Sequence, residues 1–390
     1  MEFKRTGKLD NYLYFKAVRA RCKDLSEELY ARHIFTADNN IISNPKLFWK
    51  FVNSKKNDSA NFPLEMNLDQ RSAKGGDEIA NLFAQYFSSV YRIDDVRQNL
   101  CDFDPQLQVM DTGLNVSLSD VFNRISKLNS SCKPGPDGIP SILIKNCKFS
   151  LCSPVFTLFQ SSLKEGVFPT KWKNSYTIPI FKSGERNKIV NYRGVCNQSV
   201  IPKLLDSIVS DQLQWFSKSI IPPEEYGFFA NRSTLSNLLE FRSFITEAFT
   251  DHLQVDSVYT DFAKAFDRVN HRFLLAKLDK LGFKNTTVKW LSSFLYDRSQ
   301  QVRIDNFIST PIDVTSGVPQ GTHCGPILFL LFINDIIDCF QFSNYLLFAD
   351  DLKIFRIIRT ILDAEHLQMD LDRLFAWCIK NQLFLNLDKT

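Results

Sequence analysis

Two adjacent carboxylates, Asp350 and Asp351, stand between two apolar runs in the stretch SNYLLFADDLKIF, and a third, Asp261, ends the strand-like segment SVYTD. Three carboxylates at the ends of neighbouring buried strands would repel one another and lack solvation unless a cation joined them. Oxygen ligands of this kind suit Mg²⁺. Two such ions activate an attacking hydroxyl and stabilise a leaving pyrophosphate. The alternative is an ordinary turn, because Asp favours turns.

Phosphoryl transfer also needs cations for the phosphates. The stretch IPIFKSGERNKIVNYRGV carries Lys182 and Arg193 on either side of the turn KSGERN, which predicts a two-stranded basic flap able to fold over an anion. Arg suits bidentate contact with phosphate, and Lys supplies a compact charge. Ordinary surface charge is the alternative for both residues.

The loop SGVPQGT offers close backbone approach, because Gly317 and Gly321 permit conformations that other residues avoid. Between them, Gln320 is placed to hydrogen-bond a backbone group or a base. Phe266 follows Asp261 by five residues, and a ring beside a bound sugar-phosphate would exclude a 2′-hydroxyl and favour deoxynucleotides. A core position on an apolar helix face is the alternative for Phe266.

Short elements must position these residues. The segments YLLFA and LKIFRII predict a strand-turn-strand hairpin through Asp350 and Asp351, and DSVYTDF predicts a buried strand ending near Asp261. Apolar spacing predicts a helix over 264–282 with Gly282 as its C-terminal glycine. The Gly/Pro loop 316–326 leads into ILFLLFINDII, which is apolar on all sides and predicts a fully buried helix.

Upstream of these elements, residues 75–91 carry apolar side chains at helical spacing and predict an amphipathic helix with Asp77 near its start. The segment 117–131 predicts a second helix, capped by Ser117 or Ser119. The Pro- and Gly-rich stretch CKPGPDGIP that follows must be a loop.

Composition sets the frame for these patterns. The chain has 390 residues, 44% of them hydrophobic and 23% charged, which is typical of a folded protein with two or more subdomains. The net charge is only +4, but residues 131–203 contain 11 Lys and Arg against three acidic residues. This local excess fits a surface that faces a polyanion or, equally, an ordinary solvated face.

Nine cysteines without a C-x-x-C pair argue against a zinc site or a disulfide framework. The N-terminus lacks the apolar core of a signal peptide, and the longest apolar run, Ile327–Ile333, is far too short to span a bilayer. We therefore expect an intracellular protein, nuclear or cytoplasmic, without a membrane partner.

Seven ordered blocks resemble the reverse transcriptase of non-LTR (LINE-type) retrotransposons, and among these most closely the jockey-like elements of arthropods. The blocks are KPGPDGIP, PIFKSG with NYRGV, YGFFANRSTLSNLLEF, VYTDFAKAFDRVNH, SGVPQGTHCGPILFLLFINDI, LLFADDLKIF and WCIKNQLFLNLDKT. The resemblance is strong over residues 132–390 and looser over 44–91, which is similar to the segment upstream of the polymerase.

The resemblance implies an α+β right-hand polymerase fold of fingers and palm, in which helices back an antiparallel palm sheet. Residues 1–110 would form a helical extension, 111–250 the fingers with part of the palm, and 251–390 the palm. The family's thumb and endonuclease have no counterpart in the sequence, which ends inside the last block, so we expect the thumb to be missing.

Carried over position by position, the resemblance implies a complete site. Asp261, Asp350 and Asp351 would be catalytic and bind two Mg²⁺ ions, with Mn²⁺ as a substitute, and Lys389 would assist pyrophosphate departure. The residues expected to bind substrate are Lys182, Arg193, Phe266, Gln320 and Gly321.

The implied function is RNA-directed DNA polymerisation, with an RNA template, a DNA primer and dNTPs as partners and no oligomeric state specified. An RNA-dependent RNA polymerase shares the same palm chemistry, but Phe266 argues against it. The non-enzymatic alternative is an inert, truncated relic of a retroelement that at most binds nucleic acid. The family usually has Tyr in place of Phe348, and the missing hydroxyl would alter how the primer is positioned.

Overall fold

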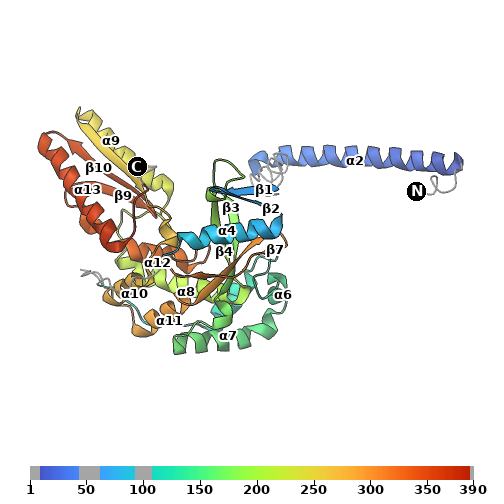
Figure 1. Cartoon of the computed structure of the whole chain (residues 1–390), viewed down its shortest axis with the longest axis horizontal. Coiled ribbons are helices and arrows are strands. Elements are labelled where there is room, and N and C mark those ends of the chain that lie inside the picture. Colours follow the sequence, from blue (N-terminus) through green and yellow to red (C-terminus); the bar gives the residue numbers. More distant parts are fainter. Residues whose placement is uncertain (1–8, 44–61, 93–107, 387–390) are drawn as a thin grey trace. The chain divides into compact units, whose positions relative to one another are not determined.

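The computed structural model describes residues 9–43, 62–92 and 108–386 (Figure 1). The contacts within the chain divide it into two units, Met1–Pro63 and Leu64–Thr390. The first unit contains the long helix α2 (Leu9–Ser43). No helix in the described part of the chain is long and apolar enough to cross a membrane. Every element named below lies in the second unit.

A three-stranded antiparallel sheet carries the three aspartates of interest. Its strands are β5 (Gln254–Asp261), β9 (Asn344–Phe348) and β10 (Asp351–Ile358), with β10 in the middle. The predicted hairpin and the predicted strand before Asp261 are therefore confirmed. These strands read as continuous apolar runs because both faces of the sheet are covered.

Helices α9 (Thr234–Thr250) and α13 (Ile361–Asn381) cover the two opposite faces of this sheet (Figure 1). Successive side chains of a strand point to opposite faces. Phe355 of β10 packs its ring against Phe241 of α9, with centroids 5.0 Å apart. Its neighbour Ile354 points the other way and joins the main core together with side chains of α13.

Five other strands of this part of the chain form a second sheet. Its strand order is β4-β3-β6-β7, and β8 also pairs with β6. Strands β3 and β4 are antiparallel, whereas β3 and β6 are parallel. The strands are β3 (Asn174–Phe181), β4 (Tyr192–Asn197), β6 (Arg298–Ile304), β7 (Phe307–Ile308) and β8 (Ile312–Val314).

The predicted amphipathic helix over 75–91 is confirmed as α4 (Gly76–Val90). Its apolar face contacts β6, β7 and β8, and the hairpin of β1 (Glu65–Leu68) and β2 (Arg71–Lys74) packs beside it. Residues 64–92 thus belong to the same unit as the two sheets. The predicted subdivision at residues 110 and 250 stays a prediction.

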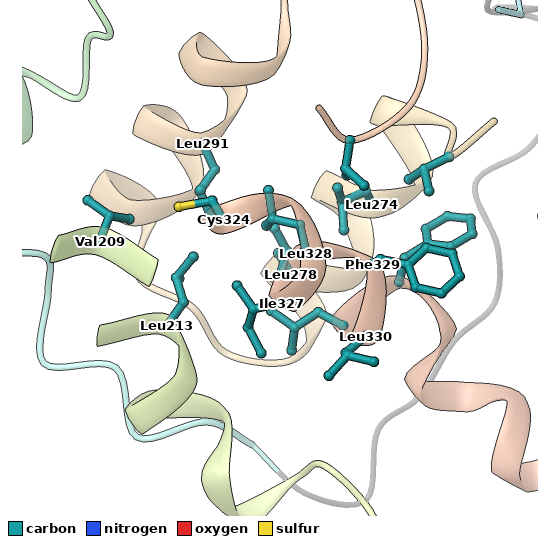
Figure 2. Packing of buried hydrophobic residues seen from close by; sticks show 14 of the residues in the cluster. Val209, Leu213, Leu274, Leu278, Leu291, Cys324, Ile327, Leu328, Phe329 and Leu330 are labelled. Atoms are coloured by element: carbon teal, nitrogen blue, oxygen red, sulfur yellow. The ribbon is translucent and has the colours of Figure 1, made fainter. Parts of the chain in front are cut away.

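Helix α12 (Cys324–Ile333) forms the centre of the main core, and all of its residues except Pro326 are buried. The predicted fully buried helix is therefore confirmed, although it ends at Ile333, where the 3₁₀ segment η5 (Asn334–Cys339) begins. Figure 2 shows side chains of the helices around α12 converging on Ile327, Leu328 and Phe329. These helices are α8 (Val200–Phe216), α10 (His271–Lys280) and α11 (Asn285–Leu295).

The helix predicted over 117–131 is α5 (Leu118–Ser126), which ends earlier than expected. Ser117, not Ser119, caps it: its Oγ accepts from the Asp120 N–H at 3.1 Å, and the Asp120 carboxylate accepts from the Ser117 N–H at 2.9 Å. Residues 132–140 form the predicted loop. The remaining elements are α6 (Ser141–Asn146), α7 (Lys148–Glu165), η1 (Thr170–Trp172), η2 (Ile189–Asn191) and η3 (Ser217–Ser219).

The helix predicted over 264–282 is wrong in its first part. Lys264 has φ +55°, a left-handed conformation that no helix interior accepts, and only the 3₁₀ turn η4 (Ala265–Asp267) follows it. Helix α10 begins after Asn270, whose Oδ1 accepts from the Phe273 N–H at 3.1 Å. The predicted end is confirmed, because Gly282 has φ +86° directly after the last turn.

Candidate active site

Asp261 and Asp351 face each other across two neighbouring strands. Asp261 is the last residue of β5 and Asp351 the first of β10, and they are direct partners in the antiparallel register. Because antiparallel strands run in opposite directions, the end of one meets the beginning of the other. The sequence thus brings together two carboxylates that are far apart along the chain.

Asp350 lies in the tight turn between β9 and β10. Phe348 and Asp351 are register partners, so only Ala349 and Asp350 connect the two strands. A two-residue hairpin turn needs a positive φ at one or both central positions, and Ala349 has φ +57°. This conformation costs a non-glycine residue about 1–2 kcal/mol. The turn is therefore strained and depends on its surroundings.

Burial and the negative charges around this turn raise the pKa of Asp350. Burial raises the pKa of Asp350 above its usual range, and the neighbouring charges of Asp351 and Asp261 raise it further, while Arg193 acts in the opposite direction. A carboxylate in such surroundings gains most from a nearby cation. The site thus has an excess of negative charge at the end of the sheet.

A cavity of about 620 Å³ opens beside this end of the sheet, within the range of small-molecule sites. Asp261 and Asp350 line it, and Asp261 also lines a neighbouring hollow together with Asp351. All five residues predicted to bind substrate line the larger cavity, namely Lys182, Arg193, Phe266, Gln320 and Gly321. Apart from Asp351 in the adjoining hollow and Lys389, which lies outside the described residues, the predicted site is brought together.

Lys182 and Arg193 come from the predicted flap, which is the antiparallel pair β3 and β4. The Lys182 N–H donates to the Asn191 carbonyl at 2.9 Å and extends the pairing beyond the end of β3. Both side chains are exposed and reach the cavity. The flap therefore presents two cations to the same space that the carboxylates line.

Phe266 lies in the turn η4 between the aspartate strand and α10. Its ring stacks on Phe329 of α12 with centroids 4.6 Å apart and 17° between the planes. A second ring, Phe228, meets it edge-on at 5.9 Å. Phe266 is half-buried. Its ring packs on the core, as the core reading predicts, and the residue also lines the cavity, as the sugar-selecting reading requires.

The loop before α12 forms another wall of the cavity. Gly317 has φ +86°, and a Cβ there would lie 2.6 Å from the Phe266 carbonyl oxygen. Gly321 has φ +102°, and a Cβ would lie 2.8 Å from Val195 Cγ1 of β4. The Gln320 carbonyl accepts from the Cys196 N–H at 2.7 Å. Only glycine at these two positions lets the loop approach both neighbours.

The three aspartates offer only oxygen donors. Carboxylate oxygens at a buried strand end are the ligands that Mg²⁺ prefers. In the described residues, however, no three His, Cys, Asp or Glu side chains converge closely enough to hold an ion together. The aspartates are instead arranged two at a time, in the two adjoining hollows described above. The chemistry of the donors fits a divalent metal, and Asp261 is common to both pairs.

Sequence reasoning missed three residues that surround the site: Glu225, Phe228 and Tyr91. Phe228 and Tyr91 line the cavity, and the Tyr91 hydroxyl accepts from Gln300 Nε2 at 2.6 Å. Glu225 lies behind the aspartate turn and accepts from its backbone. No local pattern marks these residues, because their positions depend on contacts between distant segments. Of the three, Phe228 lies within the block YGFFANRST and Tyr91 at the end of the looser resemblance over residues 44–91, whereas Glu225 lies just before the block.

The family model and the relatives in sequence agree on one family. Residues 180–390 match the model described as "Reverse transcriptase (RNA-dependent DNA polymerase)". The chain is 25% identical, over 96% of its length and 43% of the relative, to the "Probable RNA-directed DNA polymerase from transposon BS" of Drosophila melanogaster. It is 28% identical, over 70% of its length and 31% of the relative, to the "RNA-directed DNA polymerase from mobile element jockey" of the same species. The chain thus spans less than half the length of these relatives.

Among solved structures, the apo telomerase of Candida tropicalis "truncated from C-terminal domain" is similar with a TM-score of 0.42 and 13% identity, over 62% of this chain and 54% of the other. Telomerase from Candida albicans, solved with a fragment of telomeric RNA, has a TM-score of 0.40 and 12% identity, over 60% of this chain and 46% of the other.

Proposed function

The chain belongs to the reverse transcriptase (RNA-dependent DNA polymerase) family, of the non-LTR retrotransposon type, and on this premise we propose that it extends a DNA primer on an RNA template. In the proposed reaction the primer 3′-hydroxyl attacks the α-phosphate of a dNTP, a phosphodiester bond forms and pyrophosphate leaves. The observation that carries the proposal is the facing pair Asp261 and Asp351, with Asp350 turned into a cavity that two cations also line.

The three aspartates would hold divalent metal ions, Mg²⁺ or Mn²⁺, which when bound would lower the pKa of the attacking hydroxyl and stabilise the leaving pyrophosphate. The chain's own contribution is to hold the carboxylates ready. Register fixes the β-carbons of Asp261 and Asp351 opposite each other, and the two-residue turn directs Asp350 to the cavity. Lys389 keeps its proposed role in pyrophosphate departure as an expectation from the resemblance.

Lys182 and Arg193 would bind the triphosphate. They line the same cavity as Asp261 and Asp350, so they would contact phosphate oxygens while the aspartates act at the α-phosphate. The flap that carries them is a separate pair of strands from the aspartate hairpin. Substrate binding and catalysis would therefore depend on different elements of the fold.

Phe266 would select the sugar. Because Phe329 stacks beneath its ring and Phe228 meets it edge-on, the ring has little freedom to move aside for a 2′-hydroxyl. Gln320 and Gly321 line the same cavity and would contact the nascent base pair. This arrangement favours dNTPs over rNTPs and supports a DNA polymerase over an RNA polymerase.

The test is primer extension on an RNA template with dNTPs and Mg²⁺, comparing the wild type with Asp350→Ala. Loss of incorporation in Asp350→Ala is expected. The matched control is Asp256→Ala, which removes a carboxylate from the opposite end of β5, where its cross-strand partner is Arg356. Equal incorporation by the wild type and Asp350→Ala would contradict the proposed polymerase function. Salt-dependent binding of primer and template without any extension would instead favour the non-enzymatic alternative.

A further inference from the structure

Glu225 is a buried carboxylate directly behind the aspartate turn. Its side chain is only 2% exposed, yet it forms no salt bridge within the described residues. One of its oxygens, Oε1, accepts from two backbone groups, the Gly227 N–H at 2.5 Å and the Ala349 N–H at 3.1 Å. The second bond connects Glu225 to the strained residue of the turn.

The backbone around Glu225 runs beside strand β9. The Leu347 N–H donates to the Glu224 carbonyl at 2.9 Å, and the Tyr226 N–H donates to the Leu347 carbonyl at 2.9 Å. These two bonds form a parallel bridge between Glu225 and Leu347. The bridge fixes Glu225 at the outer edge of β9, two residues before the turn, so that its side chain reaches the Ala349 N–H.

Gly227 brings this segment into contact with the turn. A Cβ on Gly227 would lie 2.5 Å from the Ala349 nitrogen and 3.0 Å from Glu225 Oε1. The backbone of the segment therefore packs directly against the turn. Arg232 also holds this segment, because its Nη1 donates to the carbonyls of Pro222 and Glu225.

A strained backbone conformation persists only where surrounding contacts determine it. The left-handed φ of Ala349 is such a conformation, and the bond from its N–H to Glu225 is a contact that favours it. Loss of this acceptor would leave a buried N–H without a partner, and the turn could relax to relieve it. Relaxation would move Asp350 and Asp351, which adjoin Ala349.

We infer that Glu225 is a positioning residue for polymerisation, whose Oε1 holds the Ala349 N–H and thereby fixes Asp350 and Asp351 in the orientation that the reaction needs. This inference rests on the proposed function. The useful property is the acceptor oxygen, not the charge, because Oε2 is buried without a hydrogen-bond partner in the described structure. Glutamine offers the same acceptor and leucine offers none.

The test compares Glu225→Gln with Glu225→Leu in primer extension by the whole chain. We expect Glu225→Gln to retain kcat and Glu225→Leu to lower it by about 100-fold, as expected for a misplacement of about 1 Å at a catalytic group. The KM for dNTP should change little in both variants, because Lys182 and Arg193 lie on another pair of strands. A wild-type kcat in Glu225→Leu, or an equal loss in Glu225→Gln, overturns the inference.

Asp370→Leu is the matched control for a general loss of stability. Asp370 is likewise fully buried and accepts from the backbone N–H groups of Gln341, Phe342 and Ser343, directly before the far end of β9. This variant should lower the melting temperature and leave kcat per folded molecule unchanged. If its kcat falls as far as that of Glu225→Leu, Glu225 has no specific role.

Amide hydrogen exchange separates the inference from the proposed function. The Ala349 amide should exchange slowly in the wild type and in Glu225→Gln, and much faster in Glu225→Leu. This readout needs no activity, so it decides on Glu225 even if the wild type makes no product. Fast exchange of Ala349 in the wild type overturns the inference whether or not Glu225→Leu folds.

Discussion

Asp261 and Asp351 are direct partners in the register of β5 and β10, so two like charges meet across one antiparallel pair. Like charges in this position destabilise a sheet. At the other end of the same two strands, Asp256 instead faces Arg356. The register therefore pairs opposite charges at one end of the two strands and like charges at the end that lines the cavity.

This asymmetry predicts that Asp351→Asn stabilises the metal-free protein. Removing one of the two facing charges should raise the free energy of unfolding by about 0.5 kcal/mol in the absence of divalent ions. Urea unfolding in the presence of a chelator measures the change. Asp256→Asn is the control, since it removes a charge that lies across from Arg356 and not from a like charge, and it should not stabilise. A destabilised Asp351→Asn would contradict the prediction.

Divalent ions should stabilise the wild type more than they stabilise Asp351→Asn. Any ligand that binds the folded state alone raises its stability, so Mg²⁺ or Mn²⁺ should raise the melting temperature of the wild type. The shift should be smaller in Asp351→Asn, which lacks one oxygen donor of full charge. Thermal unfolding with and without the ion measures both. Equal shifts in the two proteins would mean that the ions bind elsewhere.

Phe266→Ala should weaken sugar selection. Because the ring is held by Phe329 and Phe228, its removal opens space for a 2′-hydroxyl, and discrimination between dNTP and rNTP should fall by roughly 10- to 200-fold. The ratio of kcat/KM for the two nucleotides measures it. Phe375→Ala, an exposed position on α13, is the control. Unchanged discrimination in Phe266→Ala would assign the ring to the core alone.

Lys182→Ala and Arg193→Ala should each raise the KM for dNTP. Loss of a hydrogen bond to a charged group costs about 1.5–3 kcal/mol, which corresponds to roughly a 10- to 150-fold weaker interaction. Steady-state kinetics with varied dNTP measures the effect. Lys188→Ala is the control, because Lys188 lies in the same flap but pairs with Glu185 at 2.8 Å. An effect as large in Lys188→Ala would point to general loss of flap structure.

The N-terminus of α13 should become less stable in acid. Arg356 Nη2 donates to Asp363 at 2.7 Å and backbone N–H groups add to it, which lowers the pKa of Asp363 to about 2 from its ordinary 3.8. A lowered carboxyl pKa contributes stability above the unfolded value and loses it as pH falls through the folded value. The stability difference between the wild type and Asp363→Asn should therefore shrink as pH falls from about 4 to about 2. Unfolding of both proteins across this range measures it, and a constant difference would contradict the assignment.

Local signals in the sequence predicted much of what holds the site. The hairpin through Asp350, the buried helix α12 and the cap at Ser117 follow from apolar runs, turn residues and capping chemistry over a few positions. The helix start was misplaced because apolar spacing continued through Phe266, whereas Asn270 supplied a competing cap. Apolar spacing alone cannot locate the first residue of a helix when the apolar pattern begins before the capping residue.

The missed residues share a different cause. Glu225 and Phe228 act through contacts with Ala349 and Phe266, which are distant in the sequence. Nothing near Glu225 distinguishes it from the adjacent Glu224, whose side chain does not reach the turn within the described contacts. Only the bridge to Leu347 determines which of the two carboxylates points inward.

The end of the sheet that lines the cavity is completed by segments from both directions of the chain. Glu224 and Tyr226 bond to β9 on one edge, and on the other the Asn386 N–H donates to the Asp261 carbonyl at 2.7 Å. During synthesis β5 emerges long before Asn386. The frame around Asp261 can therefore close only after residue 386 has left the ribosome, and until then this sheet edge is open to pairing with other strands. The frame of the aspartate site thus depends on a segment that is made well after Asp261.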